Sequence, residues 1–510
     1  MSSFRRALVA AAVVAVGLAP ALVAAQTPIV GPPHGTVMVV GGGAMGPDIY
    51  AKFIDAAGGP NALIVIVPTA GGDSVYAQNA PTTRGWRQNG AKNLYVYHTT
   101  DRTVADAESF VAVLAKAGGV WFDGGRQFHL VDSYAGTKSE RGFMSVLERG
   151  GVIGGSSAGS AILADFLVRG APSNNNFILD DPSHEKGFAY LRGAANDMHV
   201  IARERLPDLA DSIMPKYPKL LGLSEDEGTV WYVKGDTGTI LGRNKAFVYG
   251  GKDPNDPGKP FLTLYPGDKY NLGSRHVMHR AADDSPVSKK FVDGLLGKYA
   301  NASLGGATVV VSQNGEVLID QSYGVPPQEK YMPTTTLPQF SLGGISAVFS
   351  GICDQLPEQP AGRGNGGGGA AGGRGRGNAP PMTPFQACVA RRISTPIGMH
   401  RTTVSADGDV QSDVDELYRL ELGLQVKTTF MRDSSSAGGG GLDATRGWHV
   451  DSFHGTQRLS AFGKADGKRS AFIRLPERNA AIIVLTNDDN ADVKGIADKI
   501  ADKLLSQNAK

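Results

Sequence analysis

The sequence predicts an α/β protein built from two units. From about residue 35 to residue 250, short apolar strands alternate with helical stretches, which indicates a mostly parallel, doubly wound sheet with helices on both faces. A second series of strand and hairpin signals begins near residue 290. At 510 residues the chain exceeds the size of an ordinary domain, so two units are the default expectation.

In the first unit, most of the expected strands end in glycine or proline. These strands cover residues 37–40, 63–67, 94–97, 120–122 and 151–153, with a helix expected over 105–116. In such sheets ligands bind beyond the carboxyl ends of the strands, so we expect the strand ends to form one functional rim. The run from Gly41 to Gly46 lacks the spacing of a dinucleotide loop, and we do not interpret it as one.

The last of these strands leads into the most informative motif of the chain, Gly155-x-Ser157-x-Gly159. A helical run is expected directly afterwards, over residues 161–167. A strand, a sharp turn with a central serine between small residues, and a helix together indicate a nucleophile elbow, with Ser157 as the nucleophile. The alternative is an ordinary glycine-rich turn between a strand and a helix.

A serine nucleophile needs a base within hydrogen-bond reach. We expect His199 to be this base, because the strand and helix that follow the elbow would return it to the same rim. His184 and His129 are the rival candidates.

The second unit opens with a predicted hairpin whose turn is residues 313–315 and ends with a strand over 481–485 and an amphipathic helix over 492–505. The glycine-rich segment 360–381 lies between them, and we expect a disordered loop there. The two cysteines of the chain, Cys353 and Cys388, flank this segment. They form either a disulfide or two buried free thiols.

The N-terminus has the features of a signal peptide over residues 1–25, with Arg5 and Arg6 before an apolar run and small residues before Gln26. We therefore expect export to the periplasm or the extracellular space. A formal net charge of +2 with scattered basic residues argues against nucleic-acid binding. We expect no metal or other cofactor, because two cysteines and the histidine spacings do not form a ligand set.

Four motifs in the N-terminal unit occur in the order found in a known family. In chain order, these motifs are residues 121–127, 154–160, 197–205 and 223–229. Residues 35 to about 250 resemble the serine peptidases of the cyanophycinase and aspartyl-dipeptidase family, whose fold is similar to that of class I glutamine amidotransferases. The resemblance implies a peptidase domain over residues 35–285. Arg126, Met198 and Val200 depart from the family pattern, which leaves substrate detail open.

The resemblance and the chemistry of the side chains together assign roles. The backbone amides of Gly124 or Gly125 and of Ala158 are expected to hold the oxyanion. The acid of the triad stays open, with Asp180 and Asp181 ranked first. The expected substrate-binding residues are Gln127, Asp197, Arg203, Arg205 and Glu227, where the arginines would bind carboxylates and Glu227 would orient the base or hold a cationic group.

The second unit, residues 290–510, resembles a shortened class C β-lactamase or penicillin-binding protein, which implies an α+β fold. Gly344 stands where that family has its nucleophilic serine, and Ala347 stands where it has its lysine. We therefore interpret this unit as a pseudoenzyme used for binding, dimerisation or shielding. The alternative is a second active hydrolase that uses Ser341 or Ser346.

Together these features predict an exported serine peptidase of exopeptidase type. The resemblance implies cleavage of cyanophycin, an aspartate polymer with arginine branches, into β-aspartyl-arginine dipeptides. An α-aspartyl or isoaspartyl dipeptidase is the nearest alternative, and a non-catalytic binding protein is the alternative from another class. A homodimer is left open.

Overall fold

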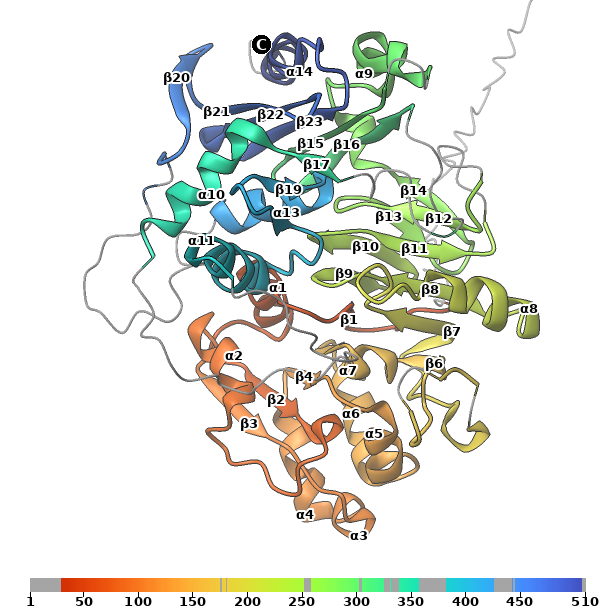
Figure 1. Ribbon diagram of the computed structural model, residues 1–510. Helices are drawn as coiled ribbons and strands as arrows, with labels where there is room; N and C mark the ends of the chain where they lie inside the picture. The colour runs from red at the N-terminus through yellow and green to blue at the C-terminus, as the bar shows by residue number, and fades with distance from the viewer. Residues whose placement is uncertain are drawn as a thin grey trace, which may run out of the picture.

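The structure is a computed structural model that describes residues 29–174, 177–179, 181–251, 258–301, 305–324, 331, 339–356, 382–425, 443 and 445–506. The predicted signal peptide, Asp180 and the glycine-rich segment 360–381 lie outside the described residues. In Figure 1 the N-terminal half forms the lower part of the molecule and the C-terminal half the upper part.

The central sheet has the strand order β14-β13-β10-β9-β1-β5-β4-β2-β3. Its parallel part is β1 (Thr36–Val40), β5 (Val152–Ser156), β4 (Gly119–Phe122), β2 (Leu63–Val67) and β3 (Asn93–Val96). Its antiparallel extension is β9 (Thr229–Lys234), β10 (Thr237–Gly242), β13 (Lys269–Asn271) and β14 (His276–His279). The expected strands are confirmed, and the sheet is mixed rather than parallel throughout.

Side chains of β1 alternate between the two faces of this sheet, so that Met38 and Val40 pack on one face and Val37 and Val39 on the other. The first face is covered by α1 (Pro47–Ala56) and α2 (Arg84–Gln88), and the second by α5 (Gln127–Tyr134) and α6 (Lys138–Glu148). A sheet buried on both faces is the doubly wound arrangement that the apolar strands predicted.

A second sheet, which the sequence did not indicate, has the order β12-β11-β8-β7-β6. Its strands are β6 (Ala164–Leu167), β7 (Leu191–Met198), β8 (Leu221–Glu225), β11 (Ala246–Tyr249) and β12 (Phe261–Leu264). The expected helix over 161–167 is wrong, because α7 (Ala158–Ala161) is one turn long and the chain then pairs as β6 with the distant β7. Tertiary pairing here overrides the local helical preference.

The helix expected over 105–116 is also divided. The chain forms α3 (Arg102–Ala105), α4 (Glu108–Val111) and a 3₁₀ turn over Ala112–Lys116. The Asp101 carboxylate accepts a hydrogen bond from the Thr103 amide and so caps the first of these short helices.

In the C-terminal half, the antiparallel sheet β16-β15-β23-β22-β21-β20 lies between two helical layers (Figure 1). Its strands are β15 (Ala307–Gln313), β16 (Glu316–Tyr323), β20 (His449–Phe453), β21 (Thr456–Ala465), β22 (Lys468–Leu475) and β23 (Ala480–Thr486). One face packs against α9 (Lys289–Leu296) and α14 (Val493–Leu505), and the other against α10 (Ser346–Cys353) and α13 (Val414–Gln425). The predicted hairpin is confirmed, with Asn314 and Gly315 both at positive φ.

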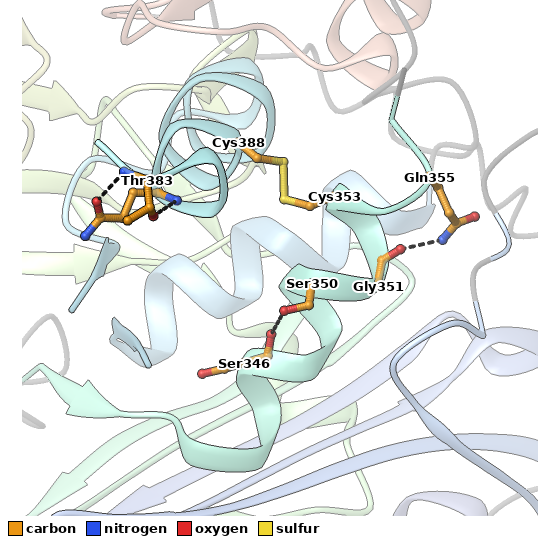
Figure 2. Close-up of a disulfide and its surroundings, with 8 residues drawn as sticks. Ser346, Ser350, Gly351, Cys353, Gln355, Thr383 and Cys388 are labelled. Atoms are coloured by element: carbon orange, nitrogen blue, oxygen red, sulfur yellow. Dashed lines mark hydrogen bonds between the residues drawn. A yellow bond between two sulfur atoms is a disulfide. The ribbon is translucent and has the colours of Figure 1, made fainter. Parts of the chain in front are cut away.

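Two small features complete this half. A short sheet joins β17 (Phe340–Ser341), β19 (Val410–Ser412) and β18 (Thr403–Val404). Figure 2 shows the disulfide between Cys353 at the end of α10 and Cys388 at the end of α11 (Pro384–Cys388), which is the first of the two alternatives that the sequence left open. Within the described residues, none of the helices combines the length and apolar character needed to cross a membrane.

The two halves are joined by buried ion pairs. Lys245, just before β11, lies 3.2 Å from the carboxylate of Asp320 on β16 and 2.5 Å from that of Asp415 on α13. Arg419 of α13 lies 3.0 Å from the carboxylate of Asp226, which follows β8. All of these side chains are buried, so the charges are paired within a shared interior and not across open solvent.

Candidate active site

Ser157 lies in a sharp turn between β5 and α7. Its backbone has φ +57° and ψ −120°, a conformation that costs free energy for a residue with a side chain and that persists only when the surroundings enforce it. The Ser157 amide donates to the carbonyl of Val40 at 3.1 Å, which fixes the turn against β1. A Cβ on Gly155 would lie 2.0 Å from the Gly159 carbonyl oxygen, so the turn requires glycine there.

His199 follows β7 and reaches the same point from the second sheet. Its Nε2 lies 2.7 Å from the Ser157 Oγ, within hydrogen-bond distance. Its backbone also has a positive φ, +59°, and its amide donates to the Gly41 carbonyl at 3.1 Å. The side chain is only 3% exposed, so the ring is held in one place.

The other ring nitrogen of His199 contacts a carboxylate. Its Nδ1 lies 2.5 Å from Oε1 of Glu227, in the turn between β8 and β9. Ser157, His199 and Glu227 therefore form a continuous hydrogen-bonded chain with the order hydroxyl, imidazole, carboxylate, which is the arrangement of a Ser-His-acid triad.

The glycines after β1 make room for this chain. A Cβ on Gly42 would lie 2.1 Å from Cε1 of His199, and a Cβ on Gly43 would lie 2.4 Å from Oε2 of Glu227. Both glycines have positive φ, +94° and +68°. The glycine run, which the sequence did not favour as a dinucleotide loop, is thus the surface against which the imidazole and the carboxylate pack.

The electrostatics suit a neutral imidazole beside an ionised carboxylate. Burial lowers the pKa of His199 from its ordinary value, and the charge of Arg203 adds to this effect against the hydrogen bond with Glu227. Burial acts to raise the pKa of Glu227, but the hydrogen bonds from His199 and His400 outweigh it and hold the pKa well below the usual range. A neutral His199 can accept a proton from Ser157.

The rival bases lie elsewhere. The ring nitrogens of His184 lie 2.9 Å from the carboxylates of Asp181 and Asp132. His129 contacts the Ala70 carbonyl at 3.2 Å. Asp181, ranked as a triad acid from the sequence, therefore contacts His184 and not His199. Asp180 lies outside the described residues.

Gly124 and Gly125 lie next to the serine, at the end of β4. A Cβ on Gly124 would be 3.3 Å from the Ser157 Cβ, so the Gly124 backbone borders the nucleophile directly. Gly125 has φ +146°, and a Cβ there would meet the Ala70 carbonyl oxygen at 2.0 Å. Ala158, on the other side of the serine, is the first residue of α7. The structure thus brings the three expected oxyanion residues to the neighbourhood of Ser157.

The expected substrate-binding residues divide into buried and exposed ones. Asp197 is fully buried, and Nε and a terminal nitrogen of Arg169 donate to its two carboxylate oxygens at 2.9 Å, so its carboxylate is engaged inside the unit. Gln127 and Arg205 are also buried, with exposed fractions of 2% and 5%. Arg203 is the exposed member, and its amide donates to the His199 carbonyl.

Sequence reasoning missed one contact of the site entirely. His400, from the C-terminal half, places its Nε2 2.6 Å from Oε2 of Glu227, the oxygen that His199 does not use. The two residues are 173 positions apart, and no local motif at residue 400 signals the contact. It depends on the packing of the two halves.

Gly344, which stands at the nucleophile position of the family that the second unit resembles, has no room for a side chain. A Cβ on Gly344 would lie 2.2 Å from the Phe462 carbonyl oxygen of β21. The neighbouring serines are engaged by carboxylates, since Ser341 donates to Asp466 at 3.0 Å and Ser346 to Asp409 at 2.9 Å. Each of these hydroxyls thus donates to a carboxylate and not to an imidazole or an amine.

Across the described residues, no group of three histidine, cysteine, aspartate or glutamate side chains is arranged to hold a metal ion.

Comparisons with known proteins define the class. Residues 37–241 match the model of peptidase family S51. The cyanophycinase of Synechococcus elongatus is 28% identical over 278 residues, which cover 48% of this chain and 82% of the relative. The cyanophycinase of Geminocystis herdmanii (strain PCC 6308) is 27% identical over 230 residues, covering 42% of this chain and 81% of the relative.

Solved structures give weaker similarities. A peptidase from an acI-B1 Actinobacterium has a TM-score of 0.38 and 21% identity, covering 47% of this chain and 97% of its own. A penicillin-binding protein homologue from Pyrococcus abyssi has a TM-score of 0.31 and 13% identity, over 42% of this chain and 77% of its own. A class C β-lactamase mutant has a TM-score of 0.30 and 11% identity, over 42% and 97%.

The N-terminal half is thus a hydrolase of the serine peptidase class. The match of residues 37–241 to the model of peptidase family S51 agrees with the family resemblance expected from the four sequence motifs.

Proposed function

We propose that the protein hydrolyses peptide-type bonds through an acyl-enzyme on Ser157. The observation that carries the proposal is the hydrogen-bonded chain from Ser157 through His199 to Glu227, built on a strained turn. His199 Nε2 takes the hydroxyl proton as Oγ attacks the carbonyl carbon, and it returns that proton to the leaving amine. Water then attacks the acyl-enzyme, again with His199 as base, and releases the acid.

Glu227 is the triad acid in this proposal, in place of Asp180 or Asp181. Its ionised carboxylate accepts from Nδ1, so it keeps the proton of neutral His199 on Nδ1 and leaves Nε2 free to accept from the serine. It also stabilises the imidazolium that forms during the attack. Backbone amides of Gly124 or Gly125 and of Ala158 would donate to the oxyanion, each contributing about 3–4 kcal/mol in comparable sites.

The proposed substrate is cyanophycin, with β-aspartyl-arginine dipeptides as product. Support comes from the two cyanophycinases that this chain resembles and from the exposed Arg203 beside His199, since a guanidinium binds carboxylates in bidentate fashion. Export to the periplasm or extracellular space belongs to the same proposal, and it rests on the sequence of residues 1–25. The second half is proposed to be catalytically inactive, since Gly344 leaves no space for a nucleophile.

The test is to incubate the purified chain with cyanophycin, with casein and with aspartyl and isoaspartyl dipeptides, and to follow product release. We expect dipeptide release from cyanophycin, a loss of several orders of magnitude in Ser157→Ala, and near-normal turnover in Ser156→Ala, the matched control one residue earlier. Cleavage of dipeptides alone would favour the dipeptidase alternative. A folded protein that cleaves none of them and leaves a serine-reactive fluorophosphonate unbound would instead be a binding protein.

A further inference from the structure

The carboxylate of Glu227 is shared between two histidines from different halves of the chain. Oε1 contacts Nδ1 of His199 at 2.5 Å, and Oε2 contacts Nε2 of His400 at 2.6 Å. A carboxylate held at only one oxygen can rotate about its last torsion, whereas contacts at both oxygens fix its plane. The orientation of the proposed triad acid therefore depends on His400.

His400 lies between α12 (Thr395–Ile397) and β18, and the residues that follow it are hydrogen-bonded to the start of α13. The backbone amides of Arg401 and Thr402 donate to a carboxylate oxygen of Glu416 at 3.1 and 3.2 Å. The Arg401 guanidinium pairs with Asp413 at 2.7 Å. These bonds leave the backbone around His400 little freedom, so the imidazole reaches Glu227 from a rigid support.

Arg419 links the segment around His400 to Asp226 in the N-terminal half. One of its terminal nitrogens donates to the Gly398 carbonyl at 2.6 Å, two residues before His400, and the other donates to the Asp226 carboxylate at 3.0 Å. Asp226 in turn accepts from the amides of Ile201 and Ala202, next to His199, at 3.0 and 2.9 Å. The C-terminal half thus contacts Glu227 directly and is linked through Asp226 to the turn that follows His199.

We propose that His400 is a positioning residue for the hydrolase, supplied by the C-terminal half to hold Glu227 in the orientation that His199 requires. This inference rests on the proposed function, in which Ser157, His199 and Glu227 act as a unit. It gives the inactive second half a role, because the triad is incompletely supported without it. Residues that orient a metal-binding histidine or carboxylate through a further hydrogen bond contribute about 10–100-fold, and we expect an effect of the same order for His400.

The charged groups that face His400 are Glu227, Glu416 and Arg419. The hydrogen bond to Glu227 raises the pKa of His400 against the opposing effects of burial and of Arg419. When His400 is protonated, its positive charge beside Glu227 disfavours protonation of His199. Removing His400 should therefore raise the pKa of His199 and move the acid limb of the reaction to higher pH.

The test measures the rate at which a fluorophosphonate labels Ser157 in the full chain, as a function of pH, so that it needs no knowledge of the substrate. We expect His400→Ala to lower the rate about 10- to 100-fold and to shift its acid limb upward. His400→Gln keeps a donor near the position of Nε2 and should restore most of the rate. His454→Ala is the matched control, since His454 also pairs with a carboxylate, that of Asp502 at 2.6 Å, on the surface.

Wild-type rate and pH profile in His400→Ala would overturn the inference while leaving the proposed function intact. A uniform loss at every pH with no rescue in His400→Gln would also overturn it, because that is the behaviour of a general structural defect. Absence of Ser157 labelling in the wild-type chain would contradict the proposed function and this inference with it.

Discussion

At the scale of single residues, the site combines a neutral base with a charged acid. His199 is buried, and its pKa is lowered by that burial and by Arg203. Its ordinary value is about 6.5. Because the proposed reaction requires neutral His199, a lowered pKa would keep the base active at pH values where an exposed histidine is already protonated.

The lowered pKa of His199 determines the expected pH profile of the reaction. Turnover should rise with pH through an acid limb whose midpoint lies below about 6.5. Arg203→Ala removes a cation that disfavours the imidazolium, so the midpoint should move to higher pH. Arg192→Ala is the control and should leave the midpoint unchanged, because Arg192 is a half-buried arginine that contacts the carbonyls of Ile29 and Gly31. The measurement is kcat/KM between pH 4 and 9. An acid limb whose midpoint lies above about 6.5 in the wild-type chain would contradict this account.

Only part of this site could be predicted from the sequence, and the reason is physical. Ser157 and His199 are recognisable because each lies in a local motif, the glycine-flanked turn and the end of a strand. The choice of Glu227 over Asp180 and Asp181 depends on which carboxylate the second sheet brings to Nδ1. His400 depends on the docking of two halves, which no local pattern records.

At the scale of elements, the glycine loop after β1 sets the position of the base. Gly42 packs directly on the imidazole, and its φ of +94° is nearly matched by φ +95° at Gly59, where a Cβ would meet nothing within 4 Å. The two positions share the backbone strain and differ in what the added methyl would contact. They therefore form a matched pair.

Gly42→Ala and Gly59→Ala should each lower the free energy of unfolding by about 1–3 kcal/mol, because both place alanine at positive φ. Only Gly42→Ala should also lose activity, by about 100-fold, because the methyl displaces His199 from Ser157. Turnover and urea unfolding of both variants test this. Equal activity in the two variants would show that the loop does not position the base.

Element prediction from sequence succeeded where each strand carries its own signal and failed where pairing decides. The strands of the parallel sheet, the hairpin at Asn314 and the helix α14 follow from local patterns. Residues 164–167 formed a strand because β7 offers them a partner from 27 residues further along the chain. Long-range pairing of this kind leaves no periodicity in the segment itself.

The disulfide links α10 and α11, and α11 leads through the following turns towards His400. Cys353 and Cys388 are separated by 35 residues, and closing such a loop stabilises by about 4 kcal/mol in the chain-entropy model. The double variant Cys353→Ala/Cys388→Ala should therefore unfold at a lower urea concentration than the oxidised wild-type chain. Addition of a reductant should shift the wild-type midpoint and leave that of the double variant unchanged. A wild-type midpoint insensitive to the reductant would contradict the bond.

At the scale of the whole molecule, the two halves share buried charges as well as the site. Lys245 pairs with Asp320 and Asp415, and the exposed fractions of the three side chains are 2%, 3% and 8%. The Lys245 carbonyl also accepts from the amide of Asp226, next to Glu227, the proposed triad acid. The buried ion pairs between the two halves are thus connected by a backbone hydrogen bond to the turn that carries Glu227.

Loss of the cation should be costly because it leaves two carboxylates buried together. We expect Lys245→Ala to lower the free energy of unfolding by about 3–5 kcal/mol. Lys289→Ala is the matched control, since Lys289 pairs with Asp293 at 3.0 Å on the surface, with exposed fractions of 49% and 40%. Its effect should stay within about 0.5 kcal/mol. Urea unfolding followed by tryptophan fluorescence measures both, and equal effects would mean that the charges at the joint are solvated in the folded protein.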